Sequence, residues 1–267
     1  MWFQLDNAAL DTAQALCIAL PAAGLPAALA RMRGRGWALV APLSILVSVA
    51  VIALWSASAE VLAWIALVLV PPGCALALGW AARGARWALA VLTAALLALA
   101  LAAPDDGAAA ELARLALVVG SVVTVGRLLA GVTPLPLLKA AILVMAVVDA
   151  AYIFGELSVD QNREFATARP GEGLPQLHIN RLGDSSLDYG DFFAAGVVGA
   201  ILAAERVRQV PAALGCLAFA LLWNQLFLVN DSLPATVPPA AVLLAVEALR
   251  LRRRGAPRSP PRAGCAT

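Results

Sequence analysis

Two aspartates lie in apolar runs where a carboxylate is costly to place. Asp149 lies inside the run 143–154, and Asp191 opens the next run, 188–196. On insertion scales a carboxylate at the centre of a bilayer costs about 2.5–3.5 kcal/mol, so an acid kept there is a functional-site hypothesis by default. Two such acids in consecutive apolar runs indicate one shared site.

A pair of carboxylates in one site can activate a water molecule. Two like charges in close contact do not ionise independently, so the pair holds one proton and titrates as a unit. The ionised member can take a proton from water, while the protonated member donates a proton to the carbonyl oxygen of the substrate. In the second step a carboxyl of the pair returns a proton to the leaving amine. This is the chemistry of aspartic proteases, placed inside a membrane.

The composition is that of an integral membrane protein. Of the 267 residues, 62% are hydrophobic and 13% are charged, and the mean hydropathy is +0.85. The charged fraction is about half of that in a typical soluble domain. We therefore expect the lipid bilayer, and no nucleic acid, among the partners of the chain.

The cysteines and the single histidine give no reason to expect a metal or a cofactor. The four cysteines have no metal-ligand spacing, and those in apolar runs are expected to behave as small hydrophobes; they are Cys17, Cys74, Cys216 and Cys265. His178 lies in a polar stretch. A solvated loop histidine is the expectation there.

Nine apolar runs approach the roughly 20 residues that a helix needs to cross the hydrocarbon core. We predict an all-α membrane protein with these nine transmembrane helices: 8–30, 37–55, 61–80, 87–103, 112–130, 135–155, 189–204, 211–229 and 233–249. The chain is then one transmembrane domain, 1–267. Helices 1–6 cover about 8–155, a polar loop covers 156–188, helices 7–9 cover about 189–249, and a tail covers 250–267.

Basic residues alternate across the connections between these helices. Under the nine-helix prediction, 15 of the 19 Lys and Arg residues fall on one side, including the cluster after 249. The positive-inside rule then places the N-terminus outside, the loop 156–188 outside and the C-terminal tail in the cytoplasm. This arrangement predicts a multi-pass protein of the cell membrane, and the composition suggests a prokaryotic plasma membrane.

The orientation gives the two aspartates a common depth. Six residues separate Asp149 from Gly155 at the outer end of its helix, which is about 9 Å at 1.5 Å per residue. Asp191 lies near the outer start of the next helix. Packed helix axes lie about 8–10 Å apart, so facing carboxylates at this depth can share one water molecule.

These residues resemble the presenilin and signal peptide peptidase family of intramembrane aspartyl proteases. That family has nine spans, one catalytic Asp in span 6, a second in a Gly-x-Gly-Asp motif opening span 7, and a Pro-Ala-Leu motif opening span 9. Here Asp149 matches the first, Gly190-Asp191 matches the end of the second, and Pro234-Ala235 matches the start of the third. The predicted orientation is that of signal peptide peptidases.

The resemblance implies a presenilin-like fold and proteolysis of membrane helices. It implies catalytic roles for Asp149 and Asp191, substrate binding by the residues Gly190, Pro234, Ala235 and Thr236, and single-span proteins or signal peptides as substrates. Three positions depart from the family pattern. Val148 precedes the first Asp, where the family commonly has Tyr. Asp188 replaces the first Gly of the Gly-x-Gly-Asp motif, and Thr236 replaces the Leu of the Pro-Ala-Leu motif. We expect Asp188 to be a solvated acid at the helix start.

The polar loop contains one strand signal. Residues 174–182 alternate between apolar and polar, which is typical of a half-buried strand. Substrate helices of the resembled family are thought to unwind and pair as a strand with the enzyme, so this segment is the candidate edge for strand addition.

Other readings of the two aspartates remain open. A proton- or cation-coupled transporter also uses intramembrane acids as a relay, although no internal repeat is visible. A non-catalytic relative would bind membrane helices without cutting them. A prepilin-peptidase-like enzyme would also carry a Gly-x-Gly-Asp motif, but its usual Lys after that Asp is Phe192 here.

The remaining polar residues in apolar runs have simpler expected roles. Asn224 and Gln225 are expected to hydrogen-bond across helices. Four charged residues near span ends are expected to extend towards the interface; they are Asp11, Arg127, Lys139 and Glu247.

Overall fold

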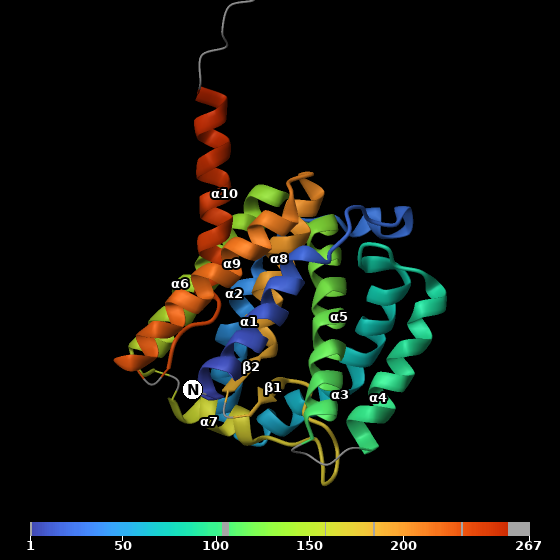
Figure 1. Cartoon of the computed structure of the whole chain (residues 1–267), viewed down its shortest axis with the longest axis vertical. Helices are drawn as coiled ribbons and strands as arrows, with labels where there is room; N and C mark the ends of the chain where they lie inside the picture. Colours follow the sequence, from blue (N-terminus) through green and yellow to red (C-terminus); the bar gives the residue numbers. More distant parts are fainter. Residues whose placement is uncertain (1, 103–106, 158, 184, 231, 256–267) are drawn as a thin grey trace, which may run out of the picture.

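The computed structural model describes residues 2–102, 107–157, 159–183, 185–230 and 232–255. It is almost entirely helical (Figure 1). The α-helices are α1 (Trp2–Ala19), α2 (Val40–Leu54), α3 (Ser58–Leu76), α4 (Leu92–Ala102), α5 (Ala108–Val132), α6 (Leu135–Phe154), α7 (Val159–Thr167), α8 (Tyr189–Ala204), α9 (Gln209–Trp223) and α10 (Val237–Gly255). Short 3-10 or π segments are η1 (Ala27–Met32), η2 (Gly36–Leu39), η3 (Ala77–Ala81), η4 (Trp87–Val91) and η5 (Asn224–Leu228), and the strands are β1 (Ile179–Leu182) and β2 (Ser185–Asp188).

Five helical stretches among the described residues are long and apolar enough to cross a membrane. They are Gly36–Leu54, Ser58–Ala81, Ala108–Val132, Leu135–Phe154 and Gln209–Leu228. Two more apolar helices, Trp87–Ala102 and Tyr189–Ala204, are shorter. The prediction of an all-α membrane protein is supported to this extent. Each of the nine predicted ranges contains a helix, but nine crossings and their orientation remain predictions.

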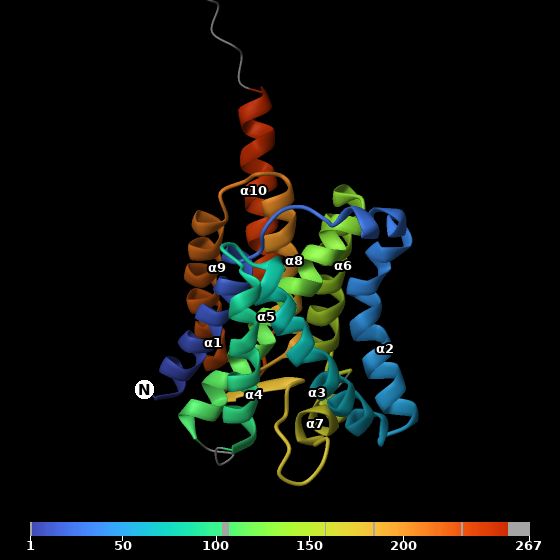
Figure 2. The ribbon, with the colours of Figure 1, turned by 90° about the vertical axis from the view of Figure 1, so that its right-hand side faces the viewer.

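Helix α5 stands at the centre, and α8 packs directly against it (Figures 1 and 2). A Cβ on Gly126 would lie 2.5 Å from the Gly196 carbonyl oxygen, and one on Gly196 would lie 2.4 Å from Val122 Cγ1. The two backbones therefore touch at glycines, as in other close crossings of membrane helices. Gly199 makes the same kind of contact with α1, where a Cβ would lie 2.5 Å from the Ile18 carbonyl oxygen.

The other helices surround this central pair. Helices α3 and α4 pack on α5, α1 packs on α8 and α9, and α6 contacts α2, α8 and α10. Small residues fill many of the buried positions, whereas large apolar side chains such as Leu54, Val147 and Leu222 are exposed on the outside. Small residues at helix contacts and large apolar residues facing outwards are typical of a bundle surrounded by lipid.

The first and last predicted helices were placed wrongly. The first, expected over 8–30, corresponds to α1 and ends at Ala19. The helix stops because the chain turns at Pro21, which forms a β-bridge with Ala82 directly after η3. The last, expected over 233–249, is the helix α10 and starts only at Val237. The segment before it stays non-helical because its groups bond to α1 and α6, as described below.

Two prolines lie inside the third helix without ending it. Pro71 and Pro72 are part of α3, which continues to Leu76 and then into the π turn η3. Just after the prolines, the Thr124 hydroxyl of α5 donates to the Gly73 carbonyl at 2.7 Å. A neighbouring helix therefore fixes this part of α3 by a hydrogen bond.

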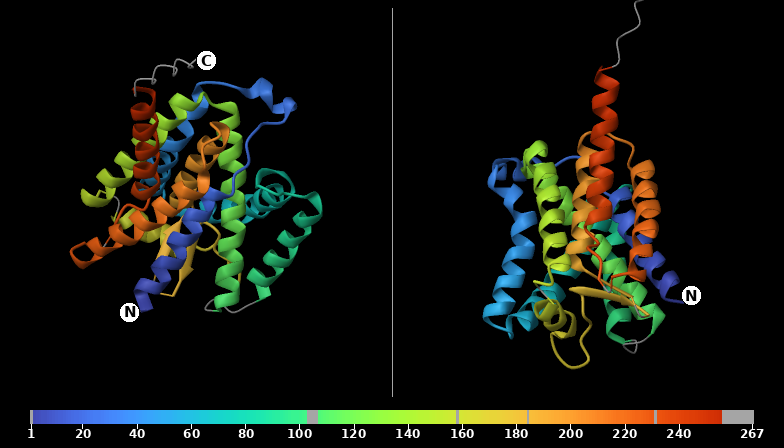
Figure 3. Two further views of the ribbon diagram at one scale, coloured as in Figure 1. Left: turned by 45° about the horizontal axis from the view of Figure 1, so that its top comes forward. Right: turned by 90° about the vertical axis from the view of Figure 1, so that its left-hand side faces the viewer.

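The predicted loop 156–188 contains structure of its own. It carries α7 and an antiparallel hairpin in which Ile179 pairs with Asp188 and Leu182 pairs with Ser185. The strand signal over 174–182 is thus confirmed for its last four residues. The hairpin, α7 and the N-terminus lie at one end of the molecule, and α10 projects from the other end (Figures 1 and 3). Most of the predicted tail, 256–267, lies outside the described residues.

Candidate functional site

The hairpin leads directly into the first turn of α8, where two of the acids lie. Asp188 is the N-cap: its Oδ1 accepts from the Asp191 backbone N at 2.9 Å, and the Asp188 backbone N donates to Asp191 Oδ2 at 3.0 Å. This reciprocal capping box satisfies two of the free N–H groups at the helix start. The expectation that Asp188 is a solvated acid is wrong, because it is half-buried and caps the helix.

Gly190 keeps the space beside this cap open. A Cβ there would lie 3.0 Å from Asp188 Oδ1, and apart from its chain neighbours and its own helix backbone it would meet only Asp188 within 4 Å among the described residues. Gly190 therefore makes no close helix–helix contact. Its lack of a side chain leaves room for the Asp188 carboxylate and leaves the surface next to Asp191 free.

Asp149 lies on α6 and is held by the segment that precedes α10. The Thr236 hydroxyl donates to Asp149 Oδ2 at 2.6 Å, and the Thr236 backbone N–H adds a second hydrogen bond to the same carboxylate. This O–H···O distance is in the range of charge-assisted hydrogen bonds. Thr236 is 2% exposed and Asp149 is half-buried.

The three carboxylates interact electrostatically. Asp191 is near enough to both Asp188 and Asp149 to interact with their charge, and Asp149 is near enough to interact with Asp188. Helices α6 and α8 are in contact, as are α10 and both of them. The structure thus brings Asp149 and Asp191 into one site, with Asp188 as a third acid beside them.

Gln14 of α1 joins two parts of the site that lie far apart in the sequence. Its Nε2 donates to the Asp191 carbonyl at 3.1 Å and to the Ala235 carbonyl at 2.8 Å, and the residue is 1% exposed. One amide therefore fixes the start of α8 against the segment Pro234–Thr236. Sequence reasoning missed Gln14; a glutamine in an apolar run was the available signal.

A small polar cavity lies behind the Ala235 segment, between α1, β2, α9 and the start of α10. Its volume is about 60 Å³, which is room for about two water molecules. Its lining includes Asp11, Trp223 and Asn224. Asp11 is 8% exposed and accepts from Asn224 Nδ2 at 2.7 Å, while Trp223 Nε1 is buried without a hydrogen-bond partner among the described residues.

Asp11 and Arg127 do not extend towards the interface as expected. Asp11 is buried against Asn224, which confirms the expected bond of Asn224 across helices. Arg127 Nε and Nη2 donate to the Gly24 and Ala23 carbonyls at 2.8 and 3.0 Å, and its guanidinium lies 3.9 Å above the Trp80 ring. Arg127 thus holds the segment after α1 against η3.

Lys139 and Glu247 also have partners inside the bundle. Lys139 Nζ lies 2.6 Å from Glu205 Oε1 and 2.8 Å from Glu247 Oε1, and Arg250 pairs with both acids. This network joins α6, the end of α8 and α10 at the end of the molecule opposite the hairpin. Gln225 donates to the Leu221 carbonyl of its own helix at 3.2 Å, and no bond of Gln225 to another helix is formed among the described residues.

His178 is buried and is not the solvated loop residue expected. It is 2% exposed, its Nε2 lies 2.9 Å from the Phe165 carbonyl oxygen, and its ring packs edge-on against the Phe165 ring. Burial lowers the pKa of His178, and the positive charge of Arg181 lowers it further. The histidine therefore fastens α7 to the hairpin as a neutral ring.

The described residues contain no group of three or more His, Cys, Asp or Glu side chains able to hold a metal ion. Cys17, Cys74 and Cys216 are buried and free, and Cys265 lies outside the described residues. The carboxylates of Asp149, Asp188 and Asp191 and the Thr236 hydroxyl donor form a set of groups that suits acid–base chemistry on water.

No family model, curated protein or solved structure matched this chain in the comparisons made with them. The site is therefore interpreted from its own residues and geometry.

Proposed function

We propose that this chain is an intramembrane aspartyl protease that hydrolyses peptide bonds of transmembrane helices. The observation that carries the proposal is the meeting of three separate segments at one place: α6 with Asp149, the start of α8 with Asp191, and the residues Pro234–Thr236 before α10. The resemblance in motif order to presenilins and signal peptide peptidases supports the same assignment.

In the proposed reaction the two carboxylates share one proton. The ionised member removes a proton from water, the oxygen of which attacks the scissile carbonyl carbon, while the protonated member donates to the carbonyl oxygen. Collapse of the tetrahedral intermediate breaks the C–N bond as a carboxyl returns a proton to the amine. Thr236 orients Asp149 throughout, and Gln14 keeps the Ala235 segment against the start of α8.

The substrate would approach from the side of the hairpin. A helical peptide bond must lose its hydrogen bonds before water can attack it, and strand addition to a sheet edge replaces them. The described sheet has two strands and ends at Asp188, so a strand added to it would arrive beside the dyad. Gly190 leaves that place open. Replacing Ile179 with Pro should lower cleavage without preventing folding, and unchanged cleavage would remove strand addition from the proposal.

The proposed protein has nine spans, with the N-terminus and the hairpin outside and the end of α10 in the cytoplasm. We infer that the membrane is the plasma membrane of a prokaryotic cell. The proposed substrates are single-span proteins or signal peptides within that membrane.

The test is cleavage of a single-span model peptide by the purified chain in lipid vesicles, with products identified by mass. The proposal expects cleavage by the wild type and none by Asp149→Asn or Asp191→Asn. Asp160→Asn is the matched control, because Asp160 is an exposed acid on α7. Cleavage that survives in either dyad variant would refute the proposed mechanism.

One observation favours a second candidate, a relative that binds membrane helices without cutting them. The capping box commits one oxygen of Asp191 to the Asp188 backbone N–H, and that oxygen is then less free to act on water. Binding of the peptide by the wild type with no product would support this candidate. A proton flux across the vesicles, lost in Asp149→Asn, would instead support a transporter.

A further inference from the structure

A pocket lined by three arginines lies at the end of the molecule from which α10 projects, away from the proposed dyad. Its volume is about 690 Å³, and its lining includes Arg83, Arg206, Arg208 and Gln209. The other lining residues are small or apolar, and no carboxylate is among them. Three positive charges and no negative one make the pocket attractive to an anion.

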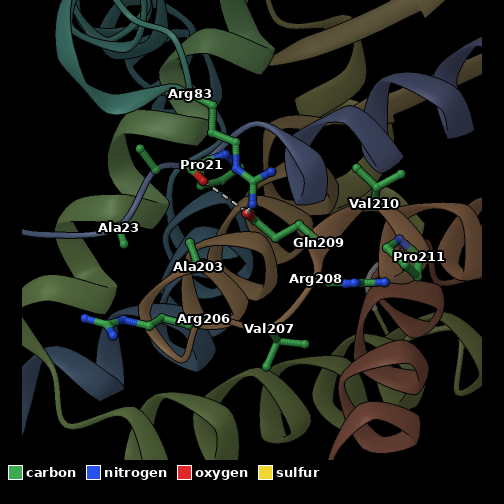
Figure 4. A pocket seen from close by; sticks show the side chains of 11 residues that line it. Pro21, Ala23, Arg83, Ala203, Arg206, Val207, Arg208, Gln209, Val210 and Pro211 are labelled. Carbon is green, nitrogen blue, oxygen red and sulfur yellow. Dashed lines mark hydrogen bonds between the residues drawn. The ribbon is translucent and has the colours of Figure 1, made fainter.

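The floor of the pocket is rigid and polar. Gln209 is 1% exposed, and its Nε2 donates to the carbonyls of Ile18, Pro21 and Gly199 at 2.9–3.0 Å. Its Oε1 accepts a hydrogen bond from Arg83 Nη2, so the guanidinium is held in place in the middle of the pocket (Figure 4). The Arg83 backbone is fixed as well, since its N–H donates to the Leu20 carbonyl at 2.8 Å.

Arg206 and Arg208 lie on opposite sides of the pocket, and their side chains extend outwards from the Arg83–Gln209 pair (Figure 4). Both are exposed, and neither has an ion pair within the part of the chain that the structure describes. The acid next to them in sequence, Glu205, points instead to Lys139 and Arg250. The described residues therefore leave the charge of these two arginines without an acidic partner.

The turn at the pocket is closed by its own backbone. Arg206 adopts φ +56° just after α8, and the N–H groups of Arg206 and Val207 donate to the Ala203 and Leu202 carbonyls at 3.0 and 2.9 Å. This is a common way for a helix to end, and it places Arg206 and Arg208 on the turn between α8 and α9.

We propose that this pocket binds a phosphate group, with Arg83 as its fixed contact and with the exposed side chains of Arg206 and Arg208 turning inwards onto the bound group. Guanidinium groups bind phosphate oxygens with paired, charge-assisted hydrogen bonds. The pocket lies at the end of the bundle predicted to be cytoplasmic, where exposed apolar residues such as Val210 and Leu214 continue from it along α9. The phosphate of an anionic lipid headgroup and a soluble phosphate share this chemistry. The inference is independent of the proposed protease activity.

The test measures binding of a short-chain phosphatidic acid to the purified full chain in neutral detergent by native mass spectrometry. Short-chain phosphatidylcholine and inorganic phosphate are the comparison probes. We expect Arg206→Gln and Arg208→Gln each to weaken binding of phosphatidic acid about tenfold, the effect of losing roughly one charge-assisted hydrogen bond. Arg252→Gln, on the exposed end of α10, is the control for a general loss of charge and should leave binding unchanged.

The competing probes identify the source of the phosphate. Displacement of the lipid by inorganic phosphate supports a soluble phosphate ligand, and displacement only by another anionic lipid supports a headgroup. Equal weakening by Arg252→Gln, or binding of phosphatidylcholine as tight as that of phosphatidic acid, would overturn the proposal. Arg83→Gln is a less suitable variant, since Arg83 also supports Gln209 and its loss can unfold the chain.

Discussion

The Thr236 hydroxyl can be removed with little change of shape, and the structure predicts what is lost. Thr236→Val keeps the volume of the side chain and keeps the backbone hydrogen bond to Asp149, but removes the 2.6 Å hydroxyl donor. If Asp149 acts on water in the proposed reaction, its orientation then rests on a single hydrogen bond. We expect the variant to fold and to cleave the model peptide more slowly.

The size of the effect follows from the strength of the missing bond. A hydrogen bond to a charged group contributes about 1.5–3 kcal/mol, which corresponds to a loss of about 10-fold to 150-fold in rate. Asp149 is half-buried, and partial exposure to water weakens such bonds, so the lower part of that range is the expected result.

The assay compares initial rates for the wild type and three variants in the same vesicles. Thr236→Ser retains a hydroxyl and should retain most of the rate. Thr133→Val is the matched control, because the buried Thr133 hydroxyl has no partner among the described residues. A full rate for Thr236→Val, or an equal loss for Thr133→Val, would refute the role assigned to the Thr236 hydroxyl.

Three other predictions concern folding. Gly196→Ala places a Cβ 2.4 Å from Val122 Cγ1 and should destabilise the bundle by about 1–3 kcal/mol in thermal unfolding. Gly215→Ala is the control, because its Cβ meets its nearest neighbour at 4.0 Å, and it should leave the unfolding temperature unchanged. Gln14→Leu leaves its two carbonyl partners without this donor and should cost about 1–3 kcal/mol in the same measurement; an unchanged unfolding temperature would contradict the bridging role. The pKa of His178 is lower in the folded chain than in the unfolded chain. As the pH falls, the unfolded chain therefore binds a proton at this histidine before the folded chain does. The free energy of unfolding should fall as the pH drops below about 6.5. A pH series on wild type and His178→Gln checks this, because the variant should lose that slope.

The positions of most helices could be predicted from the sequence, because a helix that crosses lipid must be about 20 residues long and mostly apolar. The helix over 189–204 was predicted with its observed bounds, and that over 135–155 was one residue too long. The errors occurred where tertiary hydrogen bonds decide the outcome. The segment Pro234–Thr236 is apolar enough to be helical, but Gln14 and Asp149 hold it in a non-helical turn, and no local pattern encodes those partners.

The two acids of the candidate site could be predicted from the sequence, but the residues that hold them in position could not. Asp149 and Asp191 stand out because a carboxylate in an apolar run is rare. Gln14 and the capping role of Asp188 depend on which helices meet. The burial of His178 depends on α7 packing on the hairpin, which the polar composition of the loop did not indicate.

The central claim is that Asp149 and Asp191 act as one unit on the tetrahedral intermediate. The most direct measurement is a double-mutant cycle on the affinity for a single-span peptide whose scissile amide is replaced by a hydroxyethylene group. This group resembles the intermediate, so it should bind more tightly than the unmodified peptide. The account predicts that Asp149→Asn, Asp191→Asn and the double variant all lose the same affinity, because residues acting as a unit are not additive. Additive losses, or full affinity in either single variant, would contradict it.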